Sequence, residues 1–196
     1  MNFFKNNGVK CVIVLMIVTI VSCGLLAALN GVLKVTDEER TARAIKNVYG
    51  ALVEYDDLGV TEEQRENLYG TVENVYLVGS DYLIKATGIN GYKGGTITMW
   101  SVFTVEGGSI SKIGKVLIES NEKQTLMSAL DGNFLAVYTA AGEAFLNGDG
   151  VFVTDGTDPD DIKNVAGGAT KSSTAADNAV NAALYYVRNF VTGGMD

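Results

Sequence analysis

The sequence predicts a mixed α+β domain built on an antiparallel sheet, preceded by one membrane-spanning helix at the N-terminus. Residues 11–33 contain no charged side chain, and about 20 mainly apolar residues suffice to cross a bilayer. Several segments between residues 71 and 119 alternate apolar and polar side chains with the period of a strand. These strands follow one another without intervening helices, which favours antiparallel hairpins over a doubly wound parallel sheet.

The apolar segment sets the expected topology. Lys5 and Lys10 precede it and no acidic residue occurs before Asp37, so we expect the N-terminus in the cytoplasm. Residues 1–34 would form the cytoplasmic end and the transmembrane helix. Residues 35–196 would form one domain outside the cell membrane. A cleaved signal peptide, or a lipid on Cys23 after cleavage, is the alternative. The apolar run continues past Cys23, which favours an intact helix because a signal h-region spans about 7–15 residues.

Composition excludes several kinds of site. The 196 residues include 15 Lys and Arg against 23 Asp and Glu, a net charge of −8, so nucleic acid, which requires basic patches, is not an expected partner. There is no histidine, and Cys11 and Cys23 both lie in the apolar segment. The outer domain therefore lacks the ligands of classical zinc sites and the residues of thiol or Ser-His-Asp nucleophiles. We assign no catalytic residue and no metal site, and expect any chemistry to come from carboxylates, hydroxyls or a bound cofactor.

Two capping signals predict helices at the start of the outer domain. Thr36 and Glu39 have the spacing of a capping box. The helix that follows is expected to place five apolar side chains on one face: Ile45, Val48, Tyr49, Leu52 and Val53. The segment Thr61-Glu62-Glu63-Gln64 repeats the signal before a short helix toward Leu68.

The strands are predicted in two hairpins. Residues 72–78 and 82–86 are joined by a turn at 79–81, and residues 96–105 and 109–119 by the turn Glu106-Gly107-Gly108. Trp100 lies within the third strand and is expected in the core.

The remaining elements are shorter and less regular. A short helix is expected at 124–130, a helix or loop at 134–145 and a strand at 150–154. The acidic segment 155–161 is expected to be a solvated loop rather than a cation site. A final helix is predicted at 174–191, with an apolar stripe formed by Val180, Leu184, Val187 and Val191.

A run of small residues before this last helix predicts an anion site. It reads Val165-Ala166-Gly167-Gly168-Ala169-Thr170-Lys171-Ser172-Ser173. Glycines allow a ligand close to the backbone, and the first amides of a helix have no internal partner and carry partial positive charge. Ser172 and Ser173 are expected to donate to the anion or to cap the helix. Taken alone, the run also fits an ordinary glycine turn before a serine-capped helix.

Together these features resemble the FMN-binding domain of the membrane-anchored flavin subunits of Rnf complexes and of Na⁺-pumping NADH:quinone oxidoreductases. The resemblance covers essentially the whole chain, whose length suits the Rnf G-type subunit. It rests on the N-terminal helix and on three motifs: Gly91-Tyr92-Lys93-Gly94 before a hairpin, Gln124-Thr125 after it, and residues 164–170, ending in Gly168-Ala169-Thr170. Asn164, Gly167 and Gln124 stand where the family usually has aspartate, serine or threonine, and glutamate.

The resemblance implies a covalent flavoprotein. A flavin transferase would link FMN through its phosphate to Thr170 as a phosphodiester. Gly168, Ala169 and Ser172 would shape the phosphate site, and four residues would contact the flavin: Gln124, Thr125, Gly91 and Tyr92. The protein would be an electron-transfer subunit rather than a complete enzyme. Its partners would be membrane lipid and the other membrane subunits of an Rnf-type complex, which couples electron flow between ferredoxin and NAD⁺ to Na⁺ or H⁺ movement.

Two alternatives from other classes stay open. One is a stand-alone, membrane-anchored flavoprotein for extracellular electron transfer, which lipidation of Cys23 would favour. The other is a non-redox binding module that has lost its flavin, which Asn164 and Gly167 favour because they depart from the attachment motif.

Overall fold

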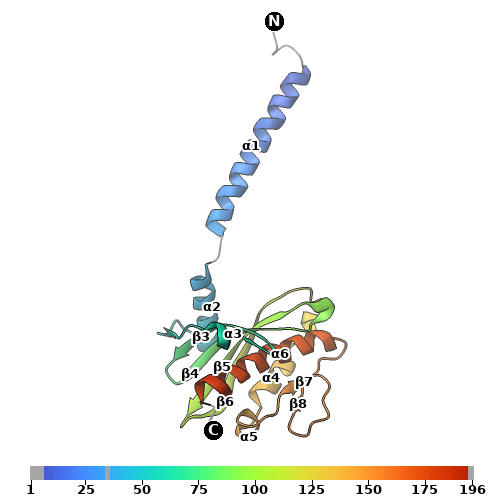
Figure 1. The fold of residues 1–196 in the computed structure, drawn as a ribbon. Helices are drawn as coiled ribbons and strands as arrows, with labels where there is room; N and C mark the ends of the chain where they lie inside the picture. Colours follow the sequence, from blue (N-terminus) through green and yellow to red (C-terminus); the bar gives the residue numbers. More distant parts are fainter. Residues whose placement is uncertain (1–6, 34–35, 194–196) are drawn as a thin grey trace. The chain divides into compact units, whose positions relative to one another are not determined.

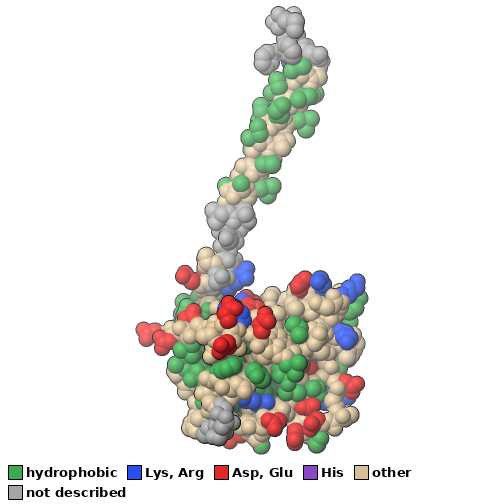
Figure 2. All heavy atoms as spheres, in the orientation of Figure 1, with side chains coloured by type: hydrophobic (Ala, Val, Ile, Leu, Met, Phe, Trp, Pro, Cys, Tyr) green, Lys and Arg blue, Asp and Glu red, His purple; other side chains and the backbone are tan. Residues whose placement is uncertain are grey.

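The computed structural model describes residues 7–33 and 36–193. The chain divides into two compact units, Met1–Ala44 and Ile45–Asp196, and the expected boundary between residues 34 and 35 lies outside the described residues. Helix α1 (Asn7–Leu33) contains the stretch Gly8–Leu29, and no other described helix is long and apolar enough to cross a bilayer. Hydrophobic side chains lie on both sides of this helix (Figure 2), as a lipid-facing segment requires.

Helix α2 (Asp37–Tyr49) begins as its capping signal predicts, since the Glu39 N–H donates to Thr36 Oγ1 over 3.2 Å. It ends earlier than predicted. Gly50 adopts a left-handed φ of 78° and donates its N–H to the Lys46 carbonyl, a common way for a helix to terminate. The prediction that Leu52 and Val53 continue the helical face is therefore wrong, and Leu52 is 66% exposed.

The sheet is antiparallel, in the order β1-β3-β4-β5-β6, with β2 also pairing to β3. The two predicted hairpins are confirmed. Val78 pairs with Asp81 across one turn and Glu106 with Ser109 across the other, and the second turn uses two left-handed glycines, as a tight hairpin requires. The strand bounds are β1 (Asp56–Asp57), β2 (Glu66–Asn67), β3 (Gly70–Val78), β4 (Asp81–Gly88), β5 (Ile97–Glu106) and β6 (Ser109–Asn121).

The remaining elements are short apart from the last helix. They are α3 (Glu62–Arg65), η2 (Tyr92–Gly94), η3 (Met127–Ala129), α4 (Gly132–Thr139), α5 (Glu143–Leu146), β7 (Phe152–Val153), β8 (Ile162–Lys163), α6 (Thr170–Tyr186) and a π-helical turn, η4 (Val187–Val191). The helix predicted at 124–130 contracts to η3, and the strand predicted at 150–154 contracts to β7. The parallel partner of β7, β8, was not predicted, because two residues are too few to show a strand period.

Helix α6, the red helix in Figure 1, packs across strands β3, β4 and β5. Val180, Leu184 and Val187 are buried as the stripe predicts. The helix approaches closely because Gly88 of β4 faces small residues. A Cβ at Gly88 would lie 2.8 Å from the Asn178 carbonyl carbon, and closer still to the Ala175 oxygen and the Ala179 nitrogen. The site carried at the start of α6 is thereby held against the sheet.

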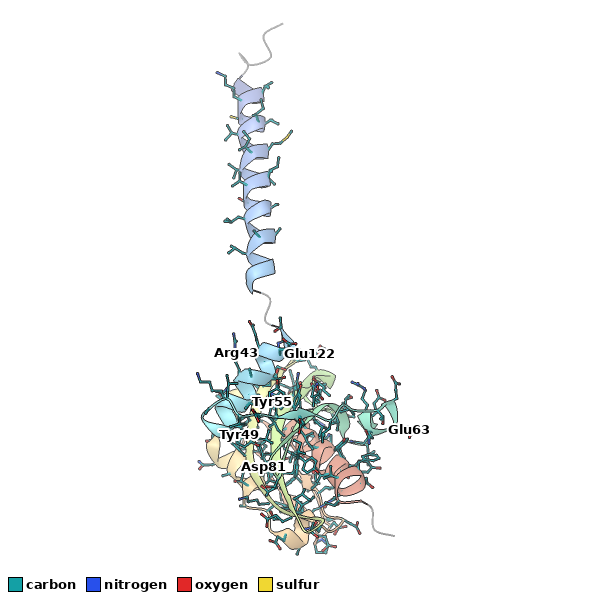
Figure 3. The ribbon with its side chains drawn as sticks, turned by 90° about the vertical axis from the view of Figure 1, so that its left-hand side faces the viewer. Arg43, Tyr49, Tyr55, Glu63, Asp81 and Glu122 are labelled. Carbon is teal, nitrogen blue, oxygen red and sulfur yellow. The ribbon has the colours of Figure 1, made fainter. Side chains whose placement is uncertain are left out.

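The opposite face of the sheet has its own aromatic packing. Trp100 is 4% exposed and stacks on Tyr76 with ring centroids 6.0 Å apart, so its expected place in the core is confirmed. On the same face of the sheet, the Tyr55 ring packs edge to face against Tyr76, and the Tyr49 hydroxyl donates to Asp81 (Figure 3). Strand β5 is consequently buried on both faces.

The acidic segment 155–161 makes structural contacts. Asp161 Oδ1 accepts from the Val151 N–H, and Asp158 Oδ1 accepts from the Asp160 N–H. These bonds hold the loop that joins β7 to β8.

Candidate functional site

Three distant segments meet at the start of α6. They line a pocket of about 340 Å³, formed by Tyr92, Thr125, Leu126, Gly168, Ala169, Thr170, Lys171 and Ser172. Six of the eight predicted site residues are among these. Of the other two, Gln124 hydrogen-bonds to the lining residues Tyr92 and Ser172, and Gly91 packs against Gln124. The fold therefore brings together all eight residues that were expected to form one site.

Gln124 joins the three segments. Its Oε1 accepts from the Tyr92 N–H at 3.1 Å and from the Ser172 hydroxyl at 3.0 Å, while its Nε2 donates to the Glu122 carbonyl at 2.8 Å. A glutamate would keep both acceptor roles and lose the donor. The amide found here is therefore matched to a carbonyl neighbour that a carboxylate would repel.

The glycines of the Gly91–Gly95 loop leave room for this side chain. A Cβ at Gly91 would lie 2.5 Å from both the Gly95 carbonyl oxygen and Gln124 Nε2. One at Gly95 would lie 2.6 Å from Gln124 Nε2 and closer still to the Glu122 carbonyl oxygen. None of these distances is compatible with a side chain. Gly91 and Gly95 are therefore required by close backbone carbonyls together with the packing of Gln124 on this loop.

The run before α6 forms a tight turn. The Ala169 N–H donates to the Ala166 carbonyl at 3.0 Å, and Gly168, the third residue of that turn, has a φ of 78°. This is the position where a type II turn requires glycine. Gly167 has open space where a Cβ would project and no left-handed φ. A serine or threonine there, as the family usually has, would fit the same backbone.

The two serines do not cap the helix as expected. The N-cap residue is Ala169, and α6 begins at Thr170 rather than Thr174, because the small residues of the run already turn the chain into the helix. Ser173 is buried, and its Oγ accepts from the Ala166 N–H and donates to the Ala169 carbonyl. Ser172 is also buried and donates to Gln124. Both hydroxyls thus hold the loop in place, and neither is free to meet an anion.

Thr170 is exposed at the first position of α6. Within residues 7–33 and 36–193, no hydrogen bond engages its hydroxyl or the backbone N–H groups of Thr170, Lys171 and Ser172. Three unpaired amides at the start of a 17-residue helix, with the Lys171 ammonium beside them, favour an anion. An anion at this pocket would meet backbone N–H groups and Lys171 rather than serine hydroxyls.

The pocket also has apolar walls. Tyr92 is 40% exposed and Leu126 is 48% exposed, although both are large hydrophobic residues. Val165, within the run, is 43% exposed. An exposed tyrosine ring and leucine side chain flanking an anion site suit a ligand that combines a phosphate with a flat aromatic ring.

Beneath the run lies a buried polar cluster that was not predicted. Asp177 Oδ1 accepts from the Tyr138 hydroxyl at 2.7 Å and from Asn164 Nδ2 at 3.2 Å. Burial raises the pKa of the Asp177 carboxyl to about 8, although both of these hydrogen bonds act to lower it. The same burial, together with the nearby carboxyl group, raises the pKa of Tyr138.

Three residues of the site were missed, each with a visible signal. Leu126 and Lys171 directly follow the predicted Thr125 and Thr170. Asp177 lies three residues before Val180 and seven before Leu184, so it belongs to the buried stripe of α6. An acidic residue on an otherwise apolar stripe indicates a buried polar contact.

A larger hollow of about 550 Å³ lies near the C-terminal end of α6 and contains none of the predicted site residues. Arg188 lines it and donates to the carbonyls of Phe145, Leu146 and Gly150. Its guanidinium therefore holds α5 and the following loop in place.

Comparison with known proteins adds no assignment, since no family model and no curated protein sequence matches this chain.

Proposed function

We propose that this chain is an electron-transfer subunit of a membrane-bound, ion-translocating complex of the Rnf type, with FMN joined to Thr170 by a phosphodiester. The observation that carries the proposal is the meeting of three sequence segments around one exposed hydroxyl. Thr170 offers that hydroxyl at the mouth of a pocket, beside three unpaired amides.

The residues of the pocket fit the two ends of FMN. The amides of Thr170, Lys171 and Ser172 and the Lys171 ammonium would hold the phosphate. The exposed Tyr92 ring and the Leu126 side chain would cover part of the isoalloxazine. When bound, the flavin supplies the electron chemistry, and the protein supplies its position and surroundings. This division of labour suits an outer domain that lacks cysteine and histidine.

The turn before Thr170 favours modification by a second enzyme. Gly167 and Gly168 are exposed and have open space around their backbone, so another active site can close over this turn. The co-substrate would be a flavin dinucleotide, in which the FMN phosphorus is activated by a pyrophosphate bond. The Thr170 oxygen would form the new bond to that phosphorus and lose its proton, while the pyrophosphate bond breaks and the nucleoside monophosphate leaves. The product is therefore heavier by FMN less one water.

Helix α1 would anchor the domain to the cell membrane, with the N-terminus inside and residues 35–196 outside. The partners proposed are the other membrane subunits of the complex, which would deliver and accept the electrons. Copurification of such subunits from native membrane distinguishes this role from a stand-alone anchored flavoprotein, which would purify without them.

The test is co-expression of the full-length chain with a flavin transferase, followed by intact-mass measurement. We expect the wild type and Thr157→Ala, a matched exposed threonine in another loop, to gain one FMN less one water. Thr170→Ala should stay at its unmodified mass. A wild-type chain that gains no such mass, although the enzyme modifies a known substrate in the same cells, contradicts the proposal and favours a non-redox module.

A further inference from the structure

The buried polar cluster beneath the run of small residues before α6 combines the carboxyl group of Asp177 with the amide of Asn164. Asn164 is 3% exposed and Asp177 is 1% exposed. Asn164 Nδ2 lies 3.2 Å from Asp177 Oδ1 and 3.4 Å from the Phe134 carbonyl oxygen. The Asn164 amide thus donates to two acceptors, and the Asp177 carboxyl group accepts from Asn164 and from Tyr138.

This cluster holds the beginning of the run. The Asn164 N–H donates to the Val153 carbonyl at 2.7 Å, which continues the pairing of β8 with β7. Its side chain ties the same residue to α6 through Asp177. Two residues later the run is tied again, through Ala166 and Ser173. Thr170 therefore follows a segment that is fixed to α6 at two points.

An aspartate at 164 could make this contact only while its carboxyl group keeps a proton. Once ionised, that group would have no hydrogen to donate, and even when protonated it would have one hydrogen for the two acceptors that Asn164 Nδ2 serves, Asp177 and the Phe134 carbonyl. Asp177 Oδ2 is itself buried and, among the described residues, has no hydrogen-bond partner.

We propose that Asp177 is a positioning residue for the segment 164–170, which ends in Thr170, and that Asn164 is its matched hydrogen-bond partner. The unit needs one carboxyl-type acceptor at 177 and one amide donor at 164. An aspartate at position 164 is therefore a poorer partner for Asp177 than the asparagine found here. This inference rests on the proposed function in one respect, that Thr170 is the residue to which FMN is attached.

The first test needs no flavin. Amide hydrogen exchange of residues 165–169 is measured in the unmodified full-length chain in detergent for four variants: Asp177→Ala, Asp177→Asn, Asn164→Asp and the double variant Asn164→Asp/Asp177→Asn. We expect exchange to quicken by roughly tenfold or more in Asp177→Ala, because a buried donor loses its acceptor. Asp177→Asn should stay close to wild type, since its carbonyl oxygen accepts the same two bonds.

The decisive pair is Asn164→Asp alone and in combination. The single variant should show faster exchange in the run and a lower unfolding midpoint at pH 8. Adding Asp177→Asn should recover most of both, because one carboxyl group again faces one amide. If Asn164→Asp behaves like wild type, or if Asp177→Asn brings no recovery, the inference is overturned.

The second readout is the fraction of chain modified on Thr170 after a fixed time with the flavin transferase. It should fall in Asp177→Ala and Asn164→Asp and return in the double variant. Absence of adduct in the wild type contradicts the proposed function, whereas an unchanged exchange pattern across the variants contradicts the positioning role. The two failures are therefore distinguishable.

Discussion

Substitution of Gly88 by alanine tests how the site is held against the sheet. The added Cβ would lie 2.8 Å from the Asn178 carbonyl carbon, whereas ordinary contacts begin at 3.4 Å. Helix α6 must therefore move by at least about 0.6 Å, and by more at the Ala175 carbonyl, which lies closer. Overpacking of this kind costs about 1–3 kcal/mol. For a domain of this size, such a loss lowers the melting temperature by about 2–4 °C per kcal/mol.

The assay is urea unfolding of the full-length chain in detergent, with Gly132→Ala as the matched control. Gly132 is the first residue of α4, and its Cβ would meet open space with no left-handed φ. The control should be neutral or slightly more stable. Gly88→Ala should lower the midpoint and leave the slope unchanged. Equal midpoints for the two variants would refute the close packing of α6 on β4.

Three further changes have defined outcomes. Gln124→Leu removes the acceptor of the Tyr92 N–H and the Ser172 hydroxyl. Because water reaches this half-buried site, we expect the free energy of unfolding in urea to fall by about 1 kcal/mol. The fraction of chain that carries FMN, measured by mass, should also fall. Burial raises the pKa of Asp177 from 3.8 to about 8, so between these pH values the folded state holds a proton that the unfolded state has lost. The free energy of unfolding should therefore fall as pH rises from 4 to 8. In Asp177→Asn this pH dependence should be flatter. Arg188→Met removes three hydrogen bonds to carbonyls and should cost about 2–4 kcal/mol by the same assay, whereas the exposed Arg65→Met should have little effect.

Much of the fold could be predicted because its signals are local. Strands β3 to β6 are long enough to show their period, and their turns carry glycines. Helix α1 carries no charged residue after Lys10. The errors occur where a single residue or a tertiary contact determines where an element ends or whether it forms. Gly50 ends α2 through its left-handed φ, and the two-residue strands β7 and β8 exist only through their mutual pairing.

The candidate site was predicted as a set of residues but not as a geometry. Sequence could suggest that the segments around Gly91, Gln124 and Thr170 belong together only through the family resemblance, since they are far apart along the chain. Their hydrogen bonds through Gln124 appear in the structure alone. The capping role expected of Ser172 and Ser173 is wrong, because local capping rules cannot foresee that both hydroxyls are buried by tertiary packing.

The most direct measurement of the central claim is peptide mapping of the purified, co-expressed protein. Lys163 and Lys171 allow trypsin to release residues 164–171, in which Thr170 is the only hydroxyl-bearing residue. The account predicts that this peptide carries the mass of FMN less one water and fluoresces as a flavin after denaturation. An unmodified peptide, with flavin absent or recovered on another peptide, would contradict it.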